Sequence, residues 1–128
     1  MGSEMCIRDR AGLIPAHQDF IRRALKIPGL KIVYGTDAVA GSHGRNAEDF
    51  IHRVRDSGVN PMDAMVSANF LGAQALSMAN QIGSIAPGLE ADIIAIRGDP
   101  LKDITGVRNV VFVMKGGVVY KYAAPPGY

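Results

Sequence analysis

The sequence predicts an α/β fold in which one strand lies between two helices and a small β unit follows. Residues 15–26 and 46–58 carry apolar side chains spaced i, i+3, i+4 and i+7, which is the pattern of an amphipathic helix. Residues 30–35, LKIVYG, form a short apolar run ended by glycine, which favours a buried strand. After residue 83 the apolar runs are short and separated by glycine and proline, as is typical of strands and turns.

The bulk composition narrows the class of protein. The chain has 128 residues, 48% of them hydrophobic, which predicts one globular domain. A net charge of +2 without a Lys/Arg-rich run argues against nucleic acid as a partner. No apolar stretch approaches the roughly 20 residues that a membrane helix needs. The single cysteine, Cys6, excludes an internal disulfide. Compartment is not predicted, and a homo-oligomer remains open.

The first ten residues, MGSEMCIRDR, differ from the rest because they are charged and aperiodic. Residues 5–10 resemble the translation of a sequencing-library adapter. We therefore expect residues 1–10 to be non-native and the native sequence to continue from within a longer protein near Ala11. The alternative is a frayed native N-terminus. We leave this segment out of the fold prediction.

The helical part has recognisable starts and stops. The first helix is expected to end before Pro28-Gly29, and the second to begin with Asn46 as its N-cap and end at Ser57-Gly58. Asn60-Pro61 is a further helix start, with the cap followed by proline at the first position. That helix is expected to break near Asn69, which would cap a short helix running through Ala79.

The β unit is predicted from three runs. Residues 91–97, 107–114 and 118–121 read as strands, and Lys115-Gly116-Gly117 reads as a hairpin turn between the last two. Residues 123–128 read as a loose tail.

Asp37 is the candidate catalytic residue. It follows the predicted strand, and a loop and a helix follow it, which is where barrel and open α/β enzymes place catalytic groups. One carboxylate at such a rigid strand end can take a proton from an attacking water and return it to a leaving nitrogen. The alternative is an aspartate that only shapes the turn or caps the helix.

Five motifs at these spacings together resemble the C-terminal end of the amidohydrolase superfamily, in its imidazolonepropionase-like and Xaa-Pro dipeptidase-like branch. They are GTDA with HGRN (35–46), NPMDAM (60–65), IGSIAPGLEADIIAI (82–96), GDPLKDI (98–104) and VVFVMKGGVVY (110–120). The resemblance implies the last strand and helices of a metal-dependent hydrolase (β/α)8 barrel in residues 11–82. It also implies part of a small composite β-sandwich in residues 83–122.

The resemblance also implies the roles of individual residues. Asp37 matches the family's acid at the end of the last barrel strand, which acts as general acid/base and can ligate a metal. His43 lies where family substrates are contacted, although a solvated loop histidine is the alternative. The family's His-x-His pair is absent, and the other histidines, His17 and His52, read as helix-surface or packing residues.

The predicted function is therefore that of a fragment. The longer protein would use one or two divalent metals, zinc above all, to hydrolyse C–N bonds of a small cyclic amide or a dipeptide. A catalytic zinc site needs about three protein ligands, so we expect this chain alone to be inactive. We also expect it to be poorly soluble, because a lone barrel strand has unpaired backbone groups on both edges. The alternatives are a non-enzymatic structural relative of the amidohydrolases and a free-standing small α/β binding module.

Overall fold

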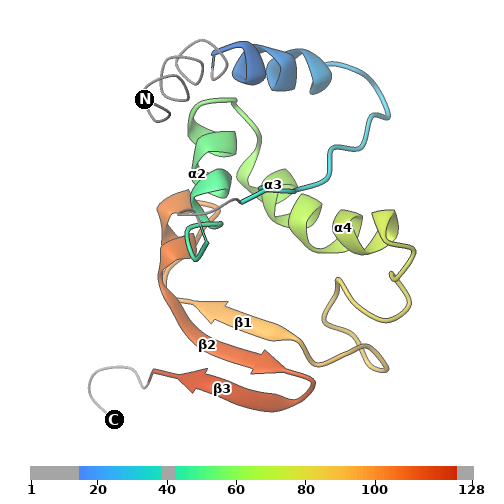
Figure 1. Ribbon diagram of the computed structural model, residues 1–128, viewed down its shortest axis with the longest axis vertical. Coiled ribbons are helices and arrows are strands. Elements are labelled where there is room, and N and C mark those ends of the chain that lie inside the picture. The colour runs from blue at the N-terminus through green and yellow to red at the C-terminus, as the bar shows by residue number, and fades with distance from the viewer. Residues whose placement is uncertain (1–14, 39–42, 124–128) are drawn as a thin grey trace, which may run out of the picture.

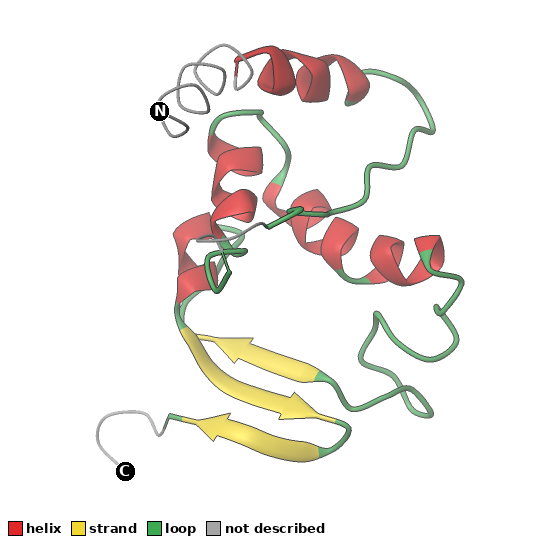
Figure 2. Ribbon diagram, viewed as in Figure 1, coloured by secondary structure: helices red, strands yellow, loops and turns green. Residues whose placement is uncertain are grey.

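A computed structural model describes residues 15–38 and 43–123, and it has a group of helices joined to a three-stranded sheet (Figure 1). Figure 2 shows the helices on one side and the strands on the other, with long loops between them. Residues 1–10, predicted to be non-native, and residues 124–128 of the predicted tail lie outside the described residues. Those two predictions therefore stay predictions.

The helices largely follow the sequence periodicity. The first spans residues 15–24, and α2 (Glu48–Arg55), α3 (Pro61–Ala68) and α4 (Phe70–Ala75) follow it. In the first helix only part of the predicted apolar stripe is covered, since Ile21 and Ala24 are buried while Phe20 and Leu25 are exposed. This helix therefore packs through one turn of its apolar face.

The helix caps confirm one prediction and correct another. Asn60 caps α3, because its side chain accepts a hydrogen bond of 2.9 Å from the Met62 amide. The helix breaks at Asn69 as predicted, and Asn69 occupies the N-cap position of α4, but its side chain makes no capping hydrogen bond. Its side-chain nitrogen donates to the Met65 carbonyl instead, at 2.8 Å. Helix α4 also ends at Ala75, short of the predicted Ala79, and Ser77 has a left-handed φ of 58° that directs the chain away.

The β unit is an antiparallel sheet of order β1-β2-β3, made of β1 (Ile93–Ile96), β2 (Val110–Lys115) and β3 (Val118–Tyr122). The predicted hairpin turn is confirmed: Gly116 and Gly117 have φ of 55° and 79°, and two positive values suit a tight hairpin. The predicted start of β2 at Val107 is wrong. Ile104–Arg108 forms the short 3-10 helix η1, because the Asp103 side chain accepts from the Thr105 amide at 3.0 Å and favours a helical start.

The predicted barrel strand does not form in this chain. Residues 31–38 have no regular secondary structure. A strand needs a neighbour to satisfy its backbone groups, and the described residues provide none beside this segment. The Tyr34 amide instead donates to the Ser67 carbonyl of α3, at 3.3 Å. The side chains nevertheless alternate, with Ile32, Tyr34 and Thr36 partly buried and those between them exposed. We refer to residues 31–37 as the Asp37 segment.

The core is small and joins the helices to the sheet. Ile51 of α2 packs with Ile104 and Val107 of η1, and the partly buried side chains around them include Phe50 and Ile96. Every residue of β3 is exposed, and so is Ile94 of β1. No second sheet covers these strands within residues 15–38 and 43–123, so the predicted β-sandwich stays a prediction. In the same residues, no helix has the length and apolar character needed to cross a membrane.

Candidate active site

Asp37 lies at the end of the Asp37 segment, with its side chain exposed. Its φ of 44° is left-handed, one of two such values at non-glycine residues in the part of the chain described here. Aspartate adopts this conformation at single positions more readily than most other non-glycine residues, because its short polar side chain can hydrogen-bond locally. Because exposure alternates along the segment, Asp37 lies on the same open face as Val33 and Gly35.

Helix α2 holds the opposite face of the segment through Tyr34. The Tyr34 ring stacks on Phe50 with 4.2 Å between centroids, and the Tyr34 hydroxyl donates to the Asn46 carbonyl at 2.5 Å. Burial raises the pKa of Tyr34 to about 12, and the nearby negative charge of Asp49 adds to the effect while Arg53 opposes it. Tyr34 is therefore a neutral anchor at physiological pH.

Arg53 of α2 makes a further set of contacts with the same segment. Its Nη1 and Nη2 donate to the carbonyls of Val33 and Gly35, both at 3.4 Å, and its Nε donates to Asp49 at 2.8 Å. The guanidinium carbon lies 4.9 Å from the centroid of the Tyr34 ring, within cation–π range. The side chain of Arg53 is only 12% exposed. The carbonyls of Val33 and Gly35 thus accept hydrogen bonds from a side chain instead of from a neighbouring strand.

Asn46 has a role that the sequence did not predict. It was expected to cap α2, but Ala47 occupies the N-cap position and makes no side-chain hydrogen bond. The Asn46 side-chain nitrogen instead donates to the Thr36 hydroxyl oxygen at 3.2 Å. Thr36 and Asn46 are ten residues apart on either side of a loop, a separation that follows neither helical nor strand periodicity, so sequence patterns carried no signal of this contact.

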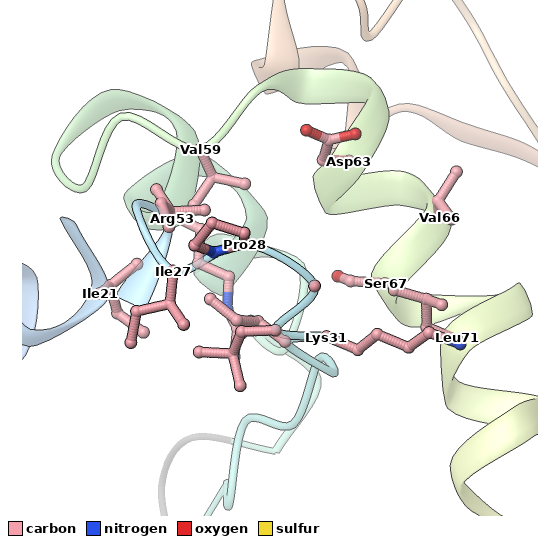
Figure 3. A pocket seen from close by; sticks show the side chains of 14 residues that line it. Ile21, Ile27, Pro28, Lys31, Arg53, Val59, Asp63, Val66, Ser67 and Leu71 are labelled. Carbon is pink, nitrogen blue, oxygen red and sulfur yellow. The ribbon is translucent and has the colours of Figure 1, made fainter. Parts of the chain in front are cut away.

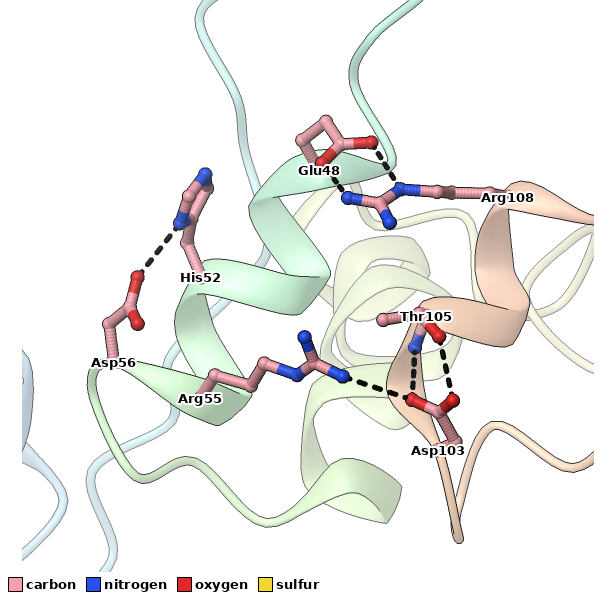
Figure 4. Close-up of polar contacts among 7 residues, drawn as sticks. All are labelled: Glu48, His52, Arg55, Asp56, Asp103, Thr105 and Arg108. Carbon is pink, nitrogen blue, oxygen red and sulfur yellow. Dashed lines mark hydrogen bonds and ion pairs between the residues drawn. The ribbon is translucent and has the colours of Figure 1, made fainter.

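His43 is exposed in a turn. Residues 39–42, between Asp37 and His43, are outside the described residues, and no hydrogen bond joins the two side chains in the part of the structure that is described. Substrate contact by His43 therefore stays a prediction. His17 and His52 are exposed on their helices as expected, and the His52 ring lies 2.8 Å from Asp56, the C-cap of α2 (Figure 4).

The residues present do not fit a catalytic metal site by themselves. Within residues 15–38 and 43–123, no three His, Cys, Asp or Glu side chains gather in a way that could hold a metal ion. The candidates Asp37 and His43 are two, whereas a catalytic zinc uses about three protein ligands. Any metal next to Asp37 would need ligands from outside these residues, and metal ligation by Asp37 stays a prediction.

A cavity of about 410 Å³ lies away from Asp37, between the first helix, the start of the Asp37 segment and α3 (Figure 3). Its walls are mostly apolar, with charged side chains from Lys31, Arg53 and Asp63. Neither Asp37 nor His43 lines it. The cavity is therefore separate from the candidate catalytic residue.

Comparison with known proteins places this arrangement in a family. Residues 5–120 match the model of the Amidohydrolase family. Ochratoxinase from Aspergillus niger is 31% identical over 113 residues, which cover 85% of this chain. Among solved structures, a Xaa-Pro dipeptidase with bound methionine is 38% identical with a TM-score of 0.78 over 84% of this chain. The A. niger ochratoxinase structure is 31% identical with a TM-score of 0.71 over 89% of it.

A prolidase complexed with N-methylphosphonate-L-proline is 30% identical, with a TM-score of 0.69 over 79% of this chain. The chain spans about a quarter of the length of these relatives: 23% of ochratoxinase, 26% of the dipeptidase and 26% of the prolidase. The family model nonetheless matches most of the sequence. The dipeptidase and ochratoxinase structures share the mixed helix and strand arrangement of this chain. The chain therefore belongs to the amidohydrolase family.

Proposed function

We propose that this chain is the C-terminal part of a longer hydrolase of C–N bonds, in which Asp37 acts as general acid/base. The observation that carries the proposal is the placement of Asp37. It has a left-handed backbone at the end of a segment that α2 holds from the opposite side, and its carboxylate is exposed on the open face. The proposed substrates are dipeptides, of the Xaa-Pro type that gives one relative its name, or small cyclic amides.

The reaction needs one group that both accepts and donates a proton. Hydrolysis of an amide requires removal of a proton from the attacking water and delivery of a proton to the leaving nitrogen. A single carboxylate can do both, provided that it stays within hydrogen-bond reach of both atoms. An exposed carboxylate at a fixed backbone position meets the requirement for accessibility, and the contacts of α2 meet the requirement for rigidity.

The uncovered apolar surface supports the idea of a larger barrel. Val33 lies on the same face as Asp37 and is 38% exposed, and Leu30 at the start of the segment is 50% exposed. A strand buried on both faces, as in a (β/α)8 barrel, would have its inward side chains covered by neighbouring strands. We therefore propose that the open face turns toward the barrel interior in the longer protein, and that the exposed strands of the β unit belong to its composite β-sandwich.

Members of the family are generally metal-dependent, and we propose that the longer protein binds a divalent metal, with zinc the first candidate. The other ligands would come from residues beyond those that the structure describes, because residues 15–38 and 43–123 do not complete a site. His43, in the loop after Asp37, is the proposed substrate contact. These assignments concern the longer protein, whose activity is not inferred for the 128 residues alone.

The test is Asp37→Asn in the longer protein, assayed with Xaa-Pro dipeptides and with a cyclic amide. General acid/base catalysis contributes about 10²–10⁴-fold, so we expect kcat to fall by that range. Asp63→Asn is the matched control, since Asp63 is an exposed carboxylate of α3 that lines the separate cavity. Its kcat should stay near that of the unaltered protein. Undiminished turnover by Asp37→Asn would refute the proposed role.

A further inference from the structure

Asn46 joins the loop that follows Asp37 to the segment that precedes Asp37. The Asn46 side-chain nitrogen donates to the Thr36 hydroxyl oxygen at 3.2 Å, and the Asn46 carbonyl accepts from the Tyr34 hydroxyl at 2.5 Å. Thr36 directly precedes Asp37, and Asn46 follows His43 by three residues. Asn46 thus ties the loop after Asp37 back to the two inward-held side chains on either side of Gly35.

We propose that Asn46 is a positioning residue for Asp37, an inference that rests on the proposed function. Thr36 and Tyr34 are two of the three partly buried residues of the segment, and Asn46 contacts both. Fixing Thr36 restricts the peptide unit that leads into Asp37, whose backbone has a left-handed φ of 44°. A carboxylate that serves two reacting atoms loses rate steeply when it is misplaced by as little as 1 Å.

The geometry excludes two alternatives for Asn46. It is not the N-cap of α2, because Ala47 occupies that position. It is not part of the apolar cavity, whose lining residues exclude it. The Asn46 amide donates one N–H to the Thr36 hydroxyl, and the effect of Asn46→Ala on KM, given below, separates this role from a direct substrate contact. The positioning role is the one that uses this bond.

The test removes the bond from each end in the longer protein. Asn46→Ala deletes the amide but keeps the backbone carbonyl that accepts from Tyr34, and Thr36→Val deletes the hydroxyl while keeping the branched shape. We expect each to lower kcat about tenfold with KM changed less than about twofold. Because both act through one hydrogen bond, the double variant should be no slower than either single variant.

The matched control is Asn69→Ala. It also removes one exposed side-chain hydrogen bond, from Asn69 to the Met65 carbonyl at 2.8 Å, but far along the chain from Asp37. Its kcat should be unchanged. A second readout is hydrogen–deuterium exchange over residues 31–38, which should become faster in Asn46→Ala and Thr36→Val and stay unchanged in Asn69→Ala.

Several outcomes would overturn the inference separately from the proposed function. If Asp37→Asn is inactive but Asn46→Ala keeps its kcat and its exchange rates, the positioning role is wrong and the catalytic role stands. Losses that multiply in the double variant would show that the two residues act independently. A raised KM with unchanged kcat in Asn46→Ala would identify a substrate contact instead. Full activity of Asp37→Asn would refute both proposals together.

Discussion

Glu48 and Arg108 form a bidentate ion pair, with the Arg108 Nε and Nη2 donating to the two carboxylate oxygens at 2.7 and 2.6 Å (Figure 4). The pair links the first turn of α2 to the last residue of η1, across 60 residues of sequence. A second pair, between Arg55 Nη2 and Asp103 at 3.3 Å, joins the last residue of α2 to the N-cap of η1. Since α2 also holds the Asp37 segment, these contacts connect the β unit to the candidate site.

The first prediction concerns the pH dependence of stability. The Arg108 hydrogen bonds hold the pKa of Glu48 below its ordinary value of 4.5. The unfolded chain therefore binds this proton more readily than the folded one, so the stabilisation is complete above pH about 4.5 and is lost as the pH falls through the lower folded pKa. In Glu48→Gln this part of the acid dependence should disappear, as measured by urea unfolding between pH 3 and pH 7.

The control for this experiment is Glu90→Gln. Glu90 belongs to none of the ion pairs found in residues 15–38 and 43–123, so its substitution should leave the acid dependence close to that of the unaltered protein. If Glu48→Gln and Glu90→Gln have the same profile, the ion pair with Arg108 contributes nothing to stability. Both partners are partly exposed, with 52% of Arg108 and 29% of Glu48 accessible, so added salt should also reduce the effect.

The second prediction compares two glycines with similar backbones. Gly83 and Gly88 have φ of 93° and 86°, so an added Cβ is strained at both, by about 1–2 kcal/mol. At Gly83 that Cβ would also meet the Ala73 Cβ at 2.5 Å, whereas at Gly88 nothing lies within 4 Å. Gly83→Ala should therefore lower the free energy of unfolding by about 1–3 kcal/mol more than Gly88→Ala does. Equal losses in chemical denaturation would contradict this packing.

The third prediction concerns the small core. Ile51 is 5% exposed and packs against Ile104 and Val107. Ile51→Ala leaves a cavity in a cluster with few other buried side chains, and it should cost about 2–5 kcal/mol in thermal or urea unfolding. Ile85→Ala is the control, because Ile85 is 85% exposed and its loss should stay within about 0.5 kcal/mol. A near-neutral Ile51→Ala would mean that α2 and η1 are held together by their ion pairs alone.

The fourth prediction concerns the start of α3. Asn60→Ala removes the side chain that accepts from the Met62 amide, and losing such a cap costs about 1 kcal/mol. Asn60→Asp should keep most of the stability, since a carboxylate is an equally good cap and suits the positive end of a helix. Urea midpoints of the two variants provide the comparison. Equal midpoints for Asn60→Ala and the unaltered protein would show that Pro61 alone sets the helix start.

Sequence patterns predicted the elements that local chemistry decides. The Asn60 cap, the Gly116-Gly117 turn and the apolar spacing of α2 depend on residues a few positions apart, and the structure confirms each of them. The extent of β2 was predicted incorrectly at its start, because the side-chain hydrogen bonds of Asp103 favour a 3-10 turn over an extended backbone. Here a local polar contact prevailed over an apolar run that reads equally well as a strand.

By itself the sequence determined the family, the order of helices and strands, and Asp37 as the residue to examine. Only the tertiary structure decided how the Asp37 segment is held. Asn46, Phe50 and Arg53 approach it from separate positions in the chain, and these contacts depend on the path of the loop and of α2. The spacing of apolar residues shows which face of a helix or strand is apolar. It does not show which residues of separate loops come into contact when the chain folds. That is why the predicted cap Asn46 proved to be a bridge to Thr36.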